Sequence, residues 1–374
     1  MSKRKILYTA TVLSHICQFH LPYLQELQTQ GCEIHVAARD NLSEKNGLRL
    51  QYVDRFIPIP FQRSPKSPEN IKAYRQLRSL IKQENYDLIV CNTPVGSIVT
   101  RLAARAARHS GTRVVYIAHG FHFYHGAPLK NWLLFYPLER AASRLTDLVI
   151  TISQEDFLLA QRKFHCPAAH IHGMGVSNQR YHPVAEETRR TLRKAECLAP
   201  DDFVILCTGE LNHNKDQETL LRAAALLKSQ IPNLKILLAG NGPLESQLKA
   251  LSKSLDLDSI VRFLGYRTDL ERVVPIVDAV VSCSRREGLP LNVVEAMLCG
   301  QPVLAAENRG TRELIQNGKT GFLFCASDPA ALAHYISILQ SDAVRSTISK
   351  QALSAVTPYT VEQVLNDLLT LLQR

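Results

Sequence analysis

Residues 285–302 read REGLPLNVVEAMLCGQPV, and this stretch indicates both a fold and a site. Glu287 precedes a Gly-Leu-Pro turn at residues 288–290, and Glu295 follows eight positions after Glu287. Proline is tolerated in the first turn of a helix, because its missing N–H needs no partner there. Glycine commonly ends helices. The spacing therefore predicts a helix over residues 291–299, with one glutamate before it and one inside it.

Short apolar strands alternate with longer helical patterns on both sides of this stretch. Strands rich in Val, Ile and Leu without polar alternation are typical of parallel sheets that are covered on both faces. The first half carries five such strands and the second half six, at residues 5–11, 32–39, 86–92, 113–120, 145–153, 203–209, 234–242, 260–266, 277–284, 302–307 and 321–325. Repeated strand–helix units predict two doubly wound α/β domains.

A turn-rich and then highly charged segment near residues 173–200 separates the two strand series. We expect one Rossmann-like domain over residues 1–185 and a second over residues 186–357. The amphipathic segment 358–374 is expected to form a helix that packs back on the first domain. Ligands of open α/β sheets bind at the carboxyl ends of the strands, so we expect the two domains to face a central cleft.

The composition favours a globular protein. The chain has 374 residues, 45% of them hydrophobic, and no apolar run long enough to cross a bilayer. The nine cysteines form no CxxC pair and are expected to be buried, reduced thiols. Residues 1–187 hold 23 Lys and Arg against 14 Asp and Glu, whereas the remainder is nearly balanced. The basic half predicts an anionic partner, and a merely soluble basic face is the alternative.

Turns with glycine follow three strands of the second half. Gly209 ends the first strand, with Lys215 six positions later, while Gly240 and Gly288 lie in turns that open helices. Glycine lets a backbone approach a ligand closely, and a helix N-terminus carries a partial positive charge. Together the turns predict a diphosphate site with Lys215 as its counter-charge. A dinucleotide site is not expected, because the turn at Gly240 lacks the third glycine of that fingerprint.

The two glutamates suit hydroxyl groups rather than phosphate. A carboxylate accepts hydrogen bonds from hydroxyls and repels an anion. Glu287 before the helix and Glu295 in its early turns would lie on either side of a bound diphosphate. This arrangement predicts a sugar nucleotide as ligand. The alternative is one glutamate that interacts with the helix dipole and one that is simply on the surface.

The stretch EGLPLNVVEAMLCGQPVLA, followed by GTRELIQNGKTGFLF, resembles the E-x7-E signature of retaining family-four glycosyltransferases of the GT-B fold. The order GEL…K, AGNGP, FLG and E-x7-E is similar to that family along the whole second domain. The first domain resembles bacterial enzymes that build exopolysaccharide, capsule or O-antigen. The matching stretches there are ILYTATVLSHICQFHLPYLQELQTQGCEIHVAA, NTPVG, AHGFHFYHGAPLKNWLLFYPLER and ITISQEDF.

The resemblance implies that residues 1–185 bind the acceptor and residues 186–357 the nucleotide sugar, and it implies a role for each matching residue. Glu287 would contact donor-sugar hydroxyls, Glu295 would bind the ribose, and Lys215 would neutralise the leaving diphosphate. His119 would be the active-site histidine near the donor sugar. Further donor contacts would come from Gly209, Gly240, Arg262, Phe263, Gly288, Leu289, Pro290, Leu291 and Asn292, those of Arg262 and Phe263 largely through main chain. The implied transfer retains the anomeric configuration and needs no metal or other cofactor.

Several positions depart from the family pattern. Glu210 stands where an arginine often follows the glycine, and Ser14 and His15 stand in place of a glycine-rich loop. These two residues are candidates for a phosphate or acceptor contact, as is His122. His119, His122 and His125 are expected to form a cluster. A metal site there is not expected, because no carboxylate or cysteine pattern accompanies the histidines.

The segment GAPLKNWLLFYPLERAASR combines apolar residues 132–136 with basic residues in a helical pattern. This pattern suits a membrane surface, and also a core-facing helix with basic ends. We therefore expect a cytoplasmic enzyme, peripherally bound to the inner face of the cytoplasmic membrane, that uses a UDP-sugar and a polyprenyl-diphosphate-linked acceptor. A sugar-nucleotide 2-epimerase of the same fold remains the alternative. Nucleic acid is not expected as a partner, because no basic motif with interleaved aromatic residues is present.

Overall fold

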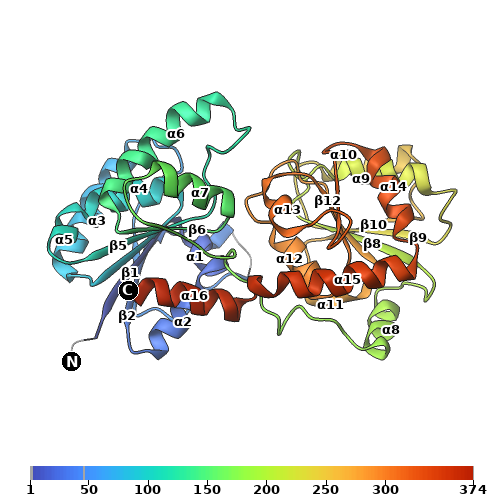
Figure 1. Cartoon of the computed structure of the whole chain (residues 1–374), viewed down its shortest axis with the longest axis horizontal. Helices are drawn as coiled ribbons and strands as arrows, with labels where there is room; N and C mark the ends of the chain where they lie inside the picture. The colour runs from blue at the N-terminus through green and yellow to red at the C-terminus, as the bar shows by residue number, and fades with distance from the viewer. Residues whose placement is uncertain (1–2, 45–46, 374) are drawn as a thin grey trace. The chain divides into compact units, whose positions relative to one another are not determined.

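The computed structural model describes residues 3–44 and 47–373 and contains two compact units (Figure 1). The first unit is Met1–Met174 with Val364–Arg374, and the second is Gly175–Gln363. The sequence had placed this division at residue 185. The outermost ends of the predicted domains, residues 1 and 374, lie outside the described ranges. That the first unit binds the acceptor and the second the donor stays a prediction.

The first unit is built on a seven-stranded sheet in the order β3-β2-β1-β4-β5-β6-β7, and all neighbouring strands are parallel. Its strands are β1 (Lys5–Val12), β2 (Glu33–Arg39), β3 (Arg55–Pro58), β4 (Leu88–Asn92), β5 (Arg113–Ala118), β6 (Leu148–Thr151) and β7 (Ala168–His170). The sequence did not predict β3 and β7. Both are short, partly exposed edge strands, so they lack the long apolar run that marks the inner strands.

Helices cover both faces of this sheet (Figure 1). They are α1 (Leu13–Phe19), α2 (Leu21–Thr29), α3 (Glu69–Glu84), α4 (Pro94–Ala103), α5 (Arg105–His109), α6 (Leu129–Ala142) and α7 (Gln154–Lys163), with short 3-10 helices at Leu42–Glu44 and Ser143–Leu145. The C-terminal part of α16 (Val361–Gln373) also belongs to this unit. There Arg4 and Arg113 donate hydrogen bonds to the carbonyl oxygen of Leu372, each over 3.0 Å.

The second unit contains a six-stranded parallel sheet in the order β10-β9-β8-β11-β12-β13. Its strands are β8 (Phe203–Thr208), β9 (Leu234–Ala239), β10 (Val261–Gly265), β11 (Ala279–Ser282), β12 (Val303–Ala306) and β13 (Phe322–Phe324). Each lies inside one of the six predicted segments. The expected class, two doubly wound Rossmann-like α/β domains, is therefore confirmed.

Two apolar clusters fill the faces of the second sheet. One joins it to α9 (Gln217–Leu227), α10 (Glu245–Ser254) and α14 (Pro329–Ile338), and the other to α12 (Leu291–Leu298) and α15 (Asp342–Val356). The remaining helices are α8 (Glu186–Ala195), α11 (Leu270–Val273) and α13 (Arg309–Leu314), with 3-10 turns at Val274–Ile276 and Thr357–Tyr359. In the parts of the chain that the structure describes, no helix is long and apolar enough to span a membrane.

The nine cysteines are all free thiols. Five are buried, but Cys197 and Cys325 are exposed and two others are partly exposed. The expectation that all nine thiols are buried is thus wrong for Cys197 and Cys325 and only partly met for Cys32 and Cys166, all four of which lie in loops.

Strand order reverses direction at one place in each sheet. In the first sheet this switch lies between β1 and β4, and in the second between β8 and β11. The connections leave such a pair of strands on opposite faces, so their carboxyl ends open into a crevice where ligands of this class of fold bind. The loops after these strands are therefore the expected positions of a ligand-binding site.

Candidate active site

In the second unit, the loops after β8 and β11 bring together two residues that the sequence singled out. Lys215 Nζ donates a hydrogen bond to Glu287 Oε1 over 2.7 Å, across 72 positions of sequence. Their side chains are only 23% and 17% exposed. Because both side chains are partly buried at a topological switch point, this ion pair differs from a solvent-exposed surface pair.

The side chain of Asp216 anchors the loop that carries Lys215. This buried residue has a positive φ of 50°, a conformation that costs energy for a residue with a side chain. Its carboxylate accepts hydrogen bonds from Ser327 Oγ over 2.6 Å and from Arg285 Nε over 3.1 Å. The Lys215 backbone N–H donates to Asn212 Oδ1 over 3.0 Å. These contacts fix the direction in which the Lys215 side chain leaves the loop.

Close backbone approaches explain two of the glycines around this pair. A Cβ on Gly240 would lie 2.0 Å from the carbonyl oxygen of Gly209, so the turns after β8 and β9 pack directly on each other. A Cβ on Gly310 would lie 2.7 Å from the carbonyl oxygen of Gly288. Side chains at these two positions would push the turns apart. The turns after β8 and β9 therefore pack against each other, and the turn at Gly288 packs against the start of α13.

Helix α12 begins directly after the turn at Gly288. It runs over Leu291–Leu298 with Pro290 as the N-cap residue, and Gly300 follows with a positive φ of 70°. The predicted helix is thus confirmed to within one residue. Asn292 Nδ2 donates to the carbonyl oxygen of Thr208 over 3.4 Å, a long bond that links the helix start to the end of β8. Leu289 and Leu291 are partly buried and pack on the apolar cluster below.

Glu295 lies one turn further into α12 in partly buried surroundings. Burial raises the pKa of its carboxyl group to about 7. A hydrogen bond from Tyr181 and the charge of Arg180 oppose this shift, while the nearby Glu271 carboxylate adds to it. Arg180 is itself paired with Glu271 over 2.8 Å. None of these three neighbours was identified from the sequence, because Tyr181, Arg180 and Glu271 come from two other segments of the chain.

The side chains of Arg262 and Phe263 face other partners. The Arg262 guanidinium pairs with the Glu196 carboxylate over 3.0 Å and also donates to the Glu196 carbonyl oxygen. Phe263 packs on the apolar cluster around α10, with the Lys249 ammonium 5.6 Å from its ring centre. The structure thus leaves only the main chain of β10 for the predicted ligand contact.

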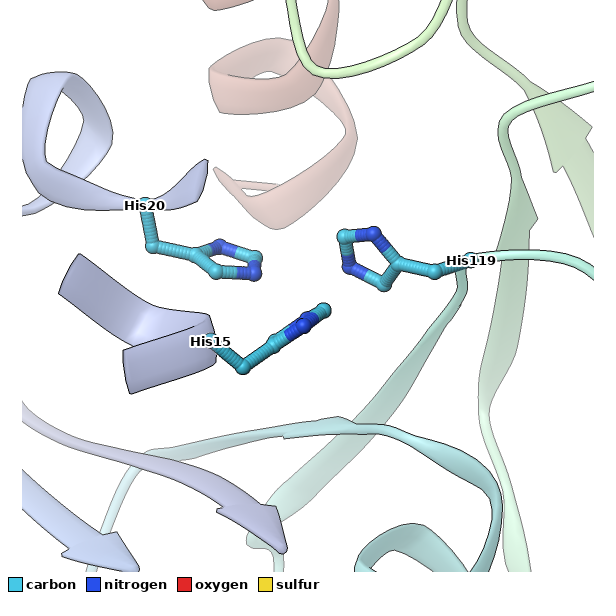
Figure 2. Close-up of side chains that lie close together, drawn as sticks. All are labelled: His15, His20 and His119. Atoms are coloured by element: carbon cyan, nitrogen blue, oxygen red, sulfur yellow. The ribbon is translucent and has the colours of Figure 1, made fainter. Parts of the chain in front are cut away.

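In the first unit, the ends of β1, β4 and β5 gather polar side chains at the switch point. His119 follows β5, and its Nε2 lies 3.4 Å from Oδ1 of Asn92 at the end of β4. The ring centroid of His119 is 4.2 Å from that of His15 and 5.4 Å from that of His20. Figure 2 shows the three rings turned toward one another, with His15 on α1, His20 in the turn between α1 and α2, and His119 at the end of β5.

The predicted cluster of His119, His122 and His125 is wrong. His122 is exposed and stacks on Phe135, with ring centroids 4.4 Å apart, and the backbone N–H of His125 donates to Glu155. The polypeptide turns away from the sheet after His119, so nearness in sequence does not bring these rings together. His20 was missed, although HICQFH places it five residues after His15.

Ser14 is buried beneath this region. Its backbone N–H donates to Asn41 Oδ1 over 3.0 Å, and its Oγ accepts from Asn41 Nδ2 over 2.9 Å. These bonds anchor the start of α1 to the loop after β2. Ser14 therefore has a structural partner, whereas the neighbouring His15 ring points to the histidine cluster.

Comparisons with known proteins identify relatives that match both units. Residues 23–174 match the family described as Glycosyltransferase Family 4, and residues 188–354 match the family described as Glycosyl transferases group 1. A Bacillus subtilis protein named as glycosyltransferase EpsD is 44% identical over 89% of this chain and 86% of its own length. The Escherichia coli UDP-Gal:alpha-D-GlcNAc-diphosphoundecaprenol alpha-1,3-galactosyltransferase is 25% identical over 93% and 91%.

A solved structure shares the fold over the full length. Anabaena HepE, crystallised with UDP, superimposes with a TM-score of 0.77 at 23% identity and covers 100% of both chains. The match over nearly the whole B. subtilis relative, at well above 30% identity, establishes the relationship independently of the fold. The chain therefore belongs to the family-four glycosyltransferases of the GT-B fold.

Proposed function

We propose that this glycosyltransferase moves a sugar from a UDP-sugar to a hydroxyl of a polyprenyl-diphosphate-linked oligosaccharide, with retention of anomeric configuration. The observation that carries the proposal is the Lys215–Glu287 pair beside the start of α12, with Glu295 further along the same helix. Relatives support the substrate classes. The E. coli relative is named for UDP-Gal and a diphosphoundecaprenol acceptor, and HepE was crystallised with UDP.

In the proposed reaction the bond between the anomeric carbon and the diphosphate oxygen breaks. The acceptor oxygen forms the new bond on the same face of the sugar, and its proton passes to the leaving diphosphate. Charge grows on the diphosphate as the bond breaks. Lys215 and the positive end of α12 would stabilise that charge, a preorganised electrostatic effect that contributes strongly to catalysis.

Each carboxylate has a separate task in this proposal. Glu287 accepts hydrogen bonds from donor-sugar hydroxyls while the anomeric carbon gains positive charge, and it also holds Lys215 in place before the donor binds. Glu295 accepts hydrogen bonds from the ribose hydroxyls. His119 contacts the donor sugar. We assign no metal or other cofactor to the transfer itself.

The substrates can be tested directly with a panel of nucleotide sugars. The purified protein would be incubated with each UDP-sugar, with and without a polyprenyl-diphosphate-linked sugar, and products followed by mass spectrometry. We expect a lipid product only with a UDP-sugar and the acceptor together, and an unchanged anomeric configuration by NMR. Conversion of UDP-N-acetylhexosamine to its 2-epimer without acceptor would instead identify an epimerase. An inverted linkage would refute retention.

Membrane association is a further part of the proposal, and α6 supports it. Its aromatic residues pack on the core, but four leucines on the helix are exposed by 40% or more: Leu129, Leu133, Leu134 and Leu138. Lys130, Arg140 and Arg144 are also exposed. An apolar strip beside basic residues suits the inner face of a membrane with anionic lipids. The first unit as a whole carries the excess of positive charge.

We expect the protein to bind vesicles that contain phosphatidylglycerol, and to release them at high salt because screening weakens the electrostatic part. The double substitution Leu129→Gln and Leu133→Gln should weaken binding several-fold in a sedimentation assay. Leu226→Gln, which alters an exposed leucine of α9 in the other unit, serves as the matched control. Equal binding by the α6 variant and the control would rule out this helix as the contact.

A further inference from the structure

The three histidines at the switch point of the first sheet form a compact group of nitrogen donors (Figure 2). One ring nitrogen from each of His15, His20 and His119 lies within 4.8 Å of the other two. Tetrahedral zinc holds its histidine nitrogens at about 2.0–2.1 Å, which places them about 3.4 Å from one another. Small rotations of the three rings would therefore bring the nitrogens to coordination distance.

Several buried ring nitrogens in this group have no hydrogen-bond partner among the described residues. His20 is fully buried, and among the described residues neither of its ring nitrogens has a hydrogen-bond partner. The Nε2 of His15 is likewise buried and unpaired. A buried polar atom without a partner costs about 1–3 kcal/mol, so proteins rarely keep several together without a purpose. The contact of His119 with Asn92, at 3.4 Å, is long and easily replaced.

The surroundings also keep these rings uncharged. Burial lowers the pKa of His15 to about 4. Burial first, and then the neighbouring histidines, lower the pKa values of His20 and His119 well below their usual range. At neutral pH all three rings are neutral imidazoles, each with one nitrogen lone pair to offer. Neutral imidazole is the form that binds a metal.

We propose that His15, His20 and His119 together bind one divalent transition-metal ion of the zinc class. Imidazole ligands favour Zn²⁺, Co²⁺, Ni²⁺ or Cu²⁺ over Mg²⁺ or Ca²⁺, which require oxygen ligands. Three histidines leave a fourth position open to water or another ligand, as in catalytic zinc sites. The signal for this site is weak in the sequence, because the three residues come from a helix, the turn that follows it and a strand end.

Metal binding would have a consequence for His119. The nitrogen that holds the ion could no longer accept a hydrogen bond from a donor-sugar hydroxyl, so a bound metal would weaken the contact of His119 with the donor. We therefore expect added Zn²⁺ to inhibit transfer and a chelator to restore it. This consequence rests on the proposed function, whereas the binding of the metal does not.

Binding can be measured without any assay of transfer. Tag-free protein, stripped of metal with a chelator, would be titrated with Zn²⁺ by calorimetry and with Co²⁺ by visible absorption. We expect one ion per chain and a cobalt spectrum of a tetrahedral site. His15→Gln and His20→Gln should each weaken binding at least about tenfold. His109→Gln, in exposed α5, and His172→Gln, beside His170, should leave it unchanged.

A variant that fails to fold would not decide the matter, so the wild-type protein provides a second measurement. X-ray absorption at the zinc edge should show three imidazole nitrogens at about 2.0 Å. Absence of a one-to-one site, a ligand shell of thiolates or carboxylates, or unchanged binding in folded His15 and His20 variants would overturn the proposal. Failure of the transfer assay alone would leave it intact.

Discussion

At the scale of single residues, Glu295 is a carboxylic acid in surroundings that favour its neutral form. Burial raises its pKa to about 7 from an ordinary value of 4.5. The folded protein therefore keeps this proton at pH values where the unfolded chain has lost it. Below pH 4.5 the full stabilising contribution is present. It is lost progressively as the pH rises from about 4.5 to about 7.

This shift predicts a change in the free energy of unfolding. We expect the second unit to lose up to about 3 kcal/mol between pH 4.5 and pH 8 through this group, since one unit of pKa corresponds to about 1.4 kcal/mol. Urea unfolding of the wild type and of Glu295→Gln would measure it, because the amide cannot ionise. Glu187→Gln, an exposed glutamate of α8, is the control. Identical pH profiles for wild type and Glu295→Gln would contradict the assigned environment.

Some contacts of single residues in a site can be predicted from the sequence, and others cannot. Lys215 and Glu287 could be predicted together, because both follow strands of one parallel sheet and the carboxyl ends of such strands meet. His20 could not, since its contact with His119 depends on how α1 and α2 pack over the sheet. The environment of Glu295 was equally hidden, because Tyr181 and Arg180 reach it from the segment before α8.

At the scale of elements, a buried ion pair joins α6 to α4. Arg101 is fully buried, and its guanidinium donates to Glu139 Oε2 over 2.7 Å and lies 4.3 Å from the ring centre of Tyr116. The charge on Arg101 has no water to stabilise it, so it depends on Glu139 and on the carbonyl oxygen of Ser97. Removal of one partner from a buried pair is costly, because it leaves the other charge unpaired.

We therefore expect Glu139→Gln to lower the free energy of unfolding of the first unit by about 3 kcal/mol. The exposed pair of Glu186 with Arg190 on α8 offers a comparison, and Glu186→Gln should change stability by less than about 0.5 kcal/mol. Thermal and urea unfolding would measure both. A change below 1 kcal/mol for Glu139→Gln would mean that the pair does not hold α6 against α4.

The sequence predicts some helices and strands better than others. Inner strands such as β8 and β9 were predicted because two covered faces require an uninterrupted apolar run. The edge strand β3, with exposed ends, two partly buried residues between them and a proline at its end, carries no such run. For α6, the apolar pattern left open whether the helix faces the core or a membrane. In the structure, Trp132, Phe135 and Tyr136 of α6 pack on the core, whereas four leucines of the same helix are exposed.

At the scale of the whole molecule, the two sheets share the same strand order around their switch points. Each sheet carries a cluster of polar side chains at its own switch point. The second unit supplies an ammonium, a helix N-terminus and two carboxylates, which suit a nucleotide sugar. The first unit supplies neutral histidines and the chain's excess of positive charge. We therefore propose that the second unit binds the donor and the first unit the acceptor.

We propose that Glu287 acts on the donor sugar and does not stabilise the fold. Replacement by glutamine keeps the size of the side chain and an oxygen that can accept from Lys215, but removes the negative charge. The measurement is turnover of the lipid-linked acceptor by Glu287→Gln, together with its affinity for UDP by calorimetry. Glu210→Gln, an exposed glutamate in the loop that carries Lys215, is the control.

We predict that Glu287→Gln lowers kcat by about 10²–10³, the effect of losing one transition-state contact, while affinity for UDP changes less than about threefold. Glu210→Gln should retain nearly full turnover. Full turnover by a folded Glu287→Gln variant with a proven donor and acceptor would contradict the account.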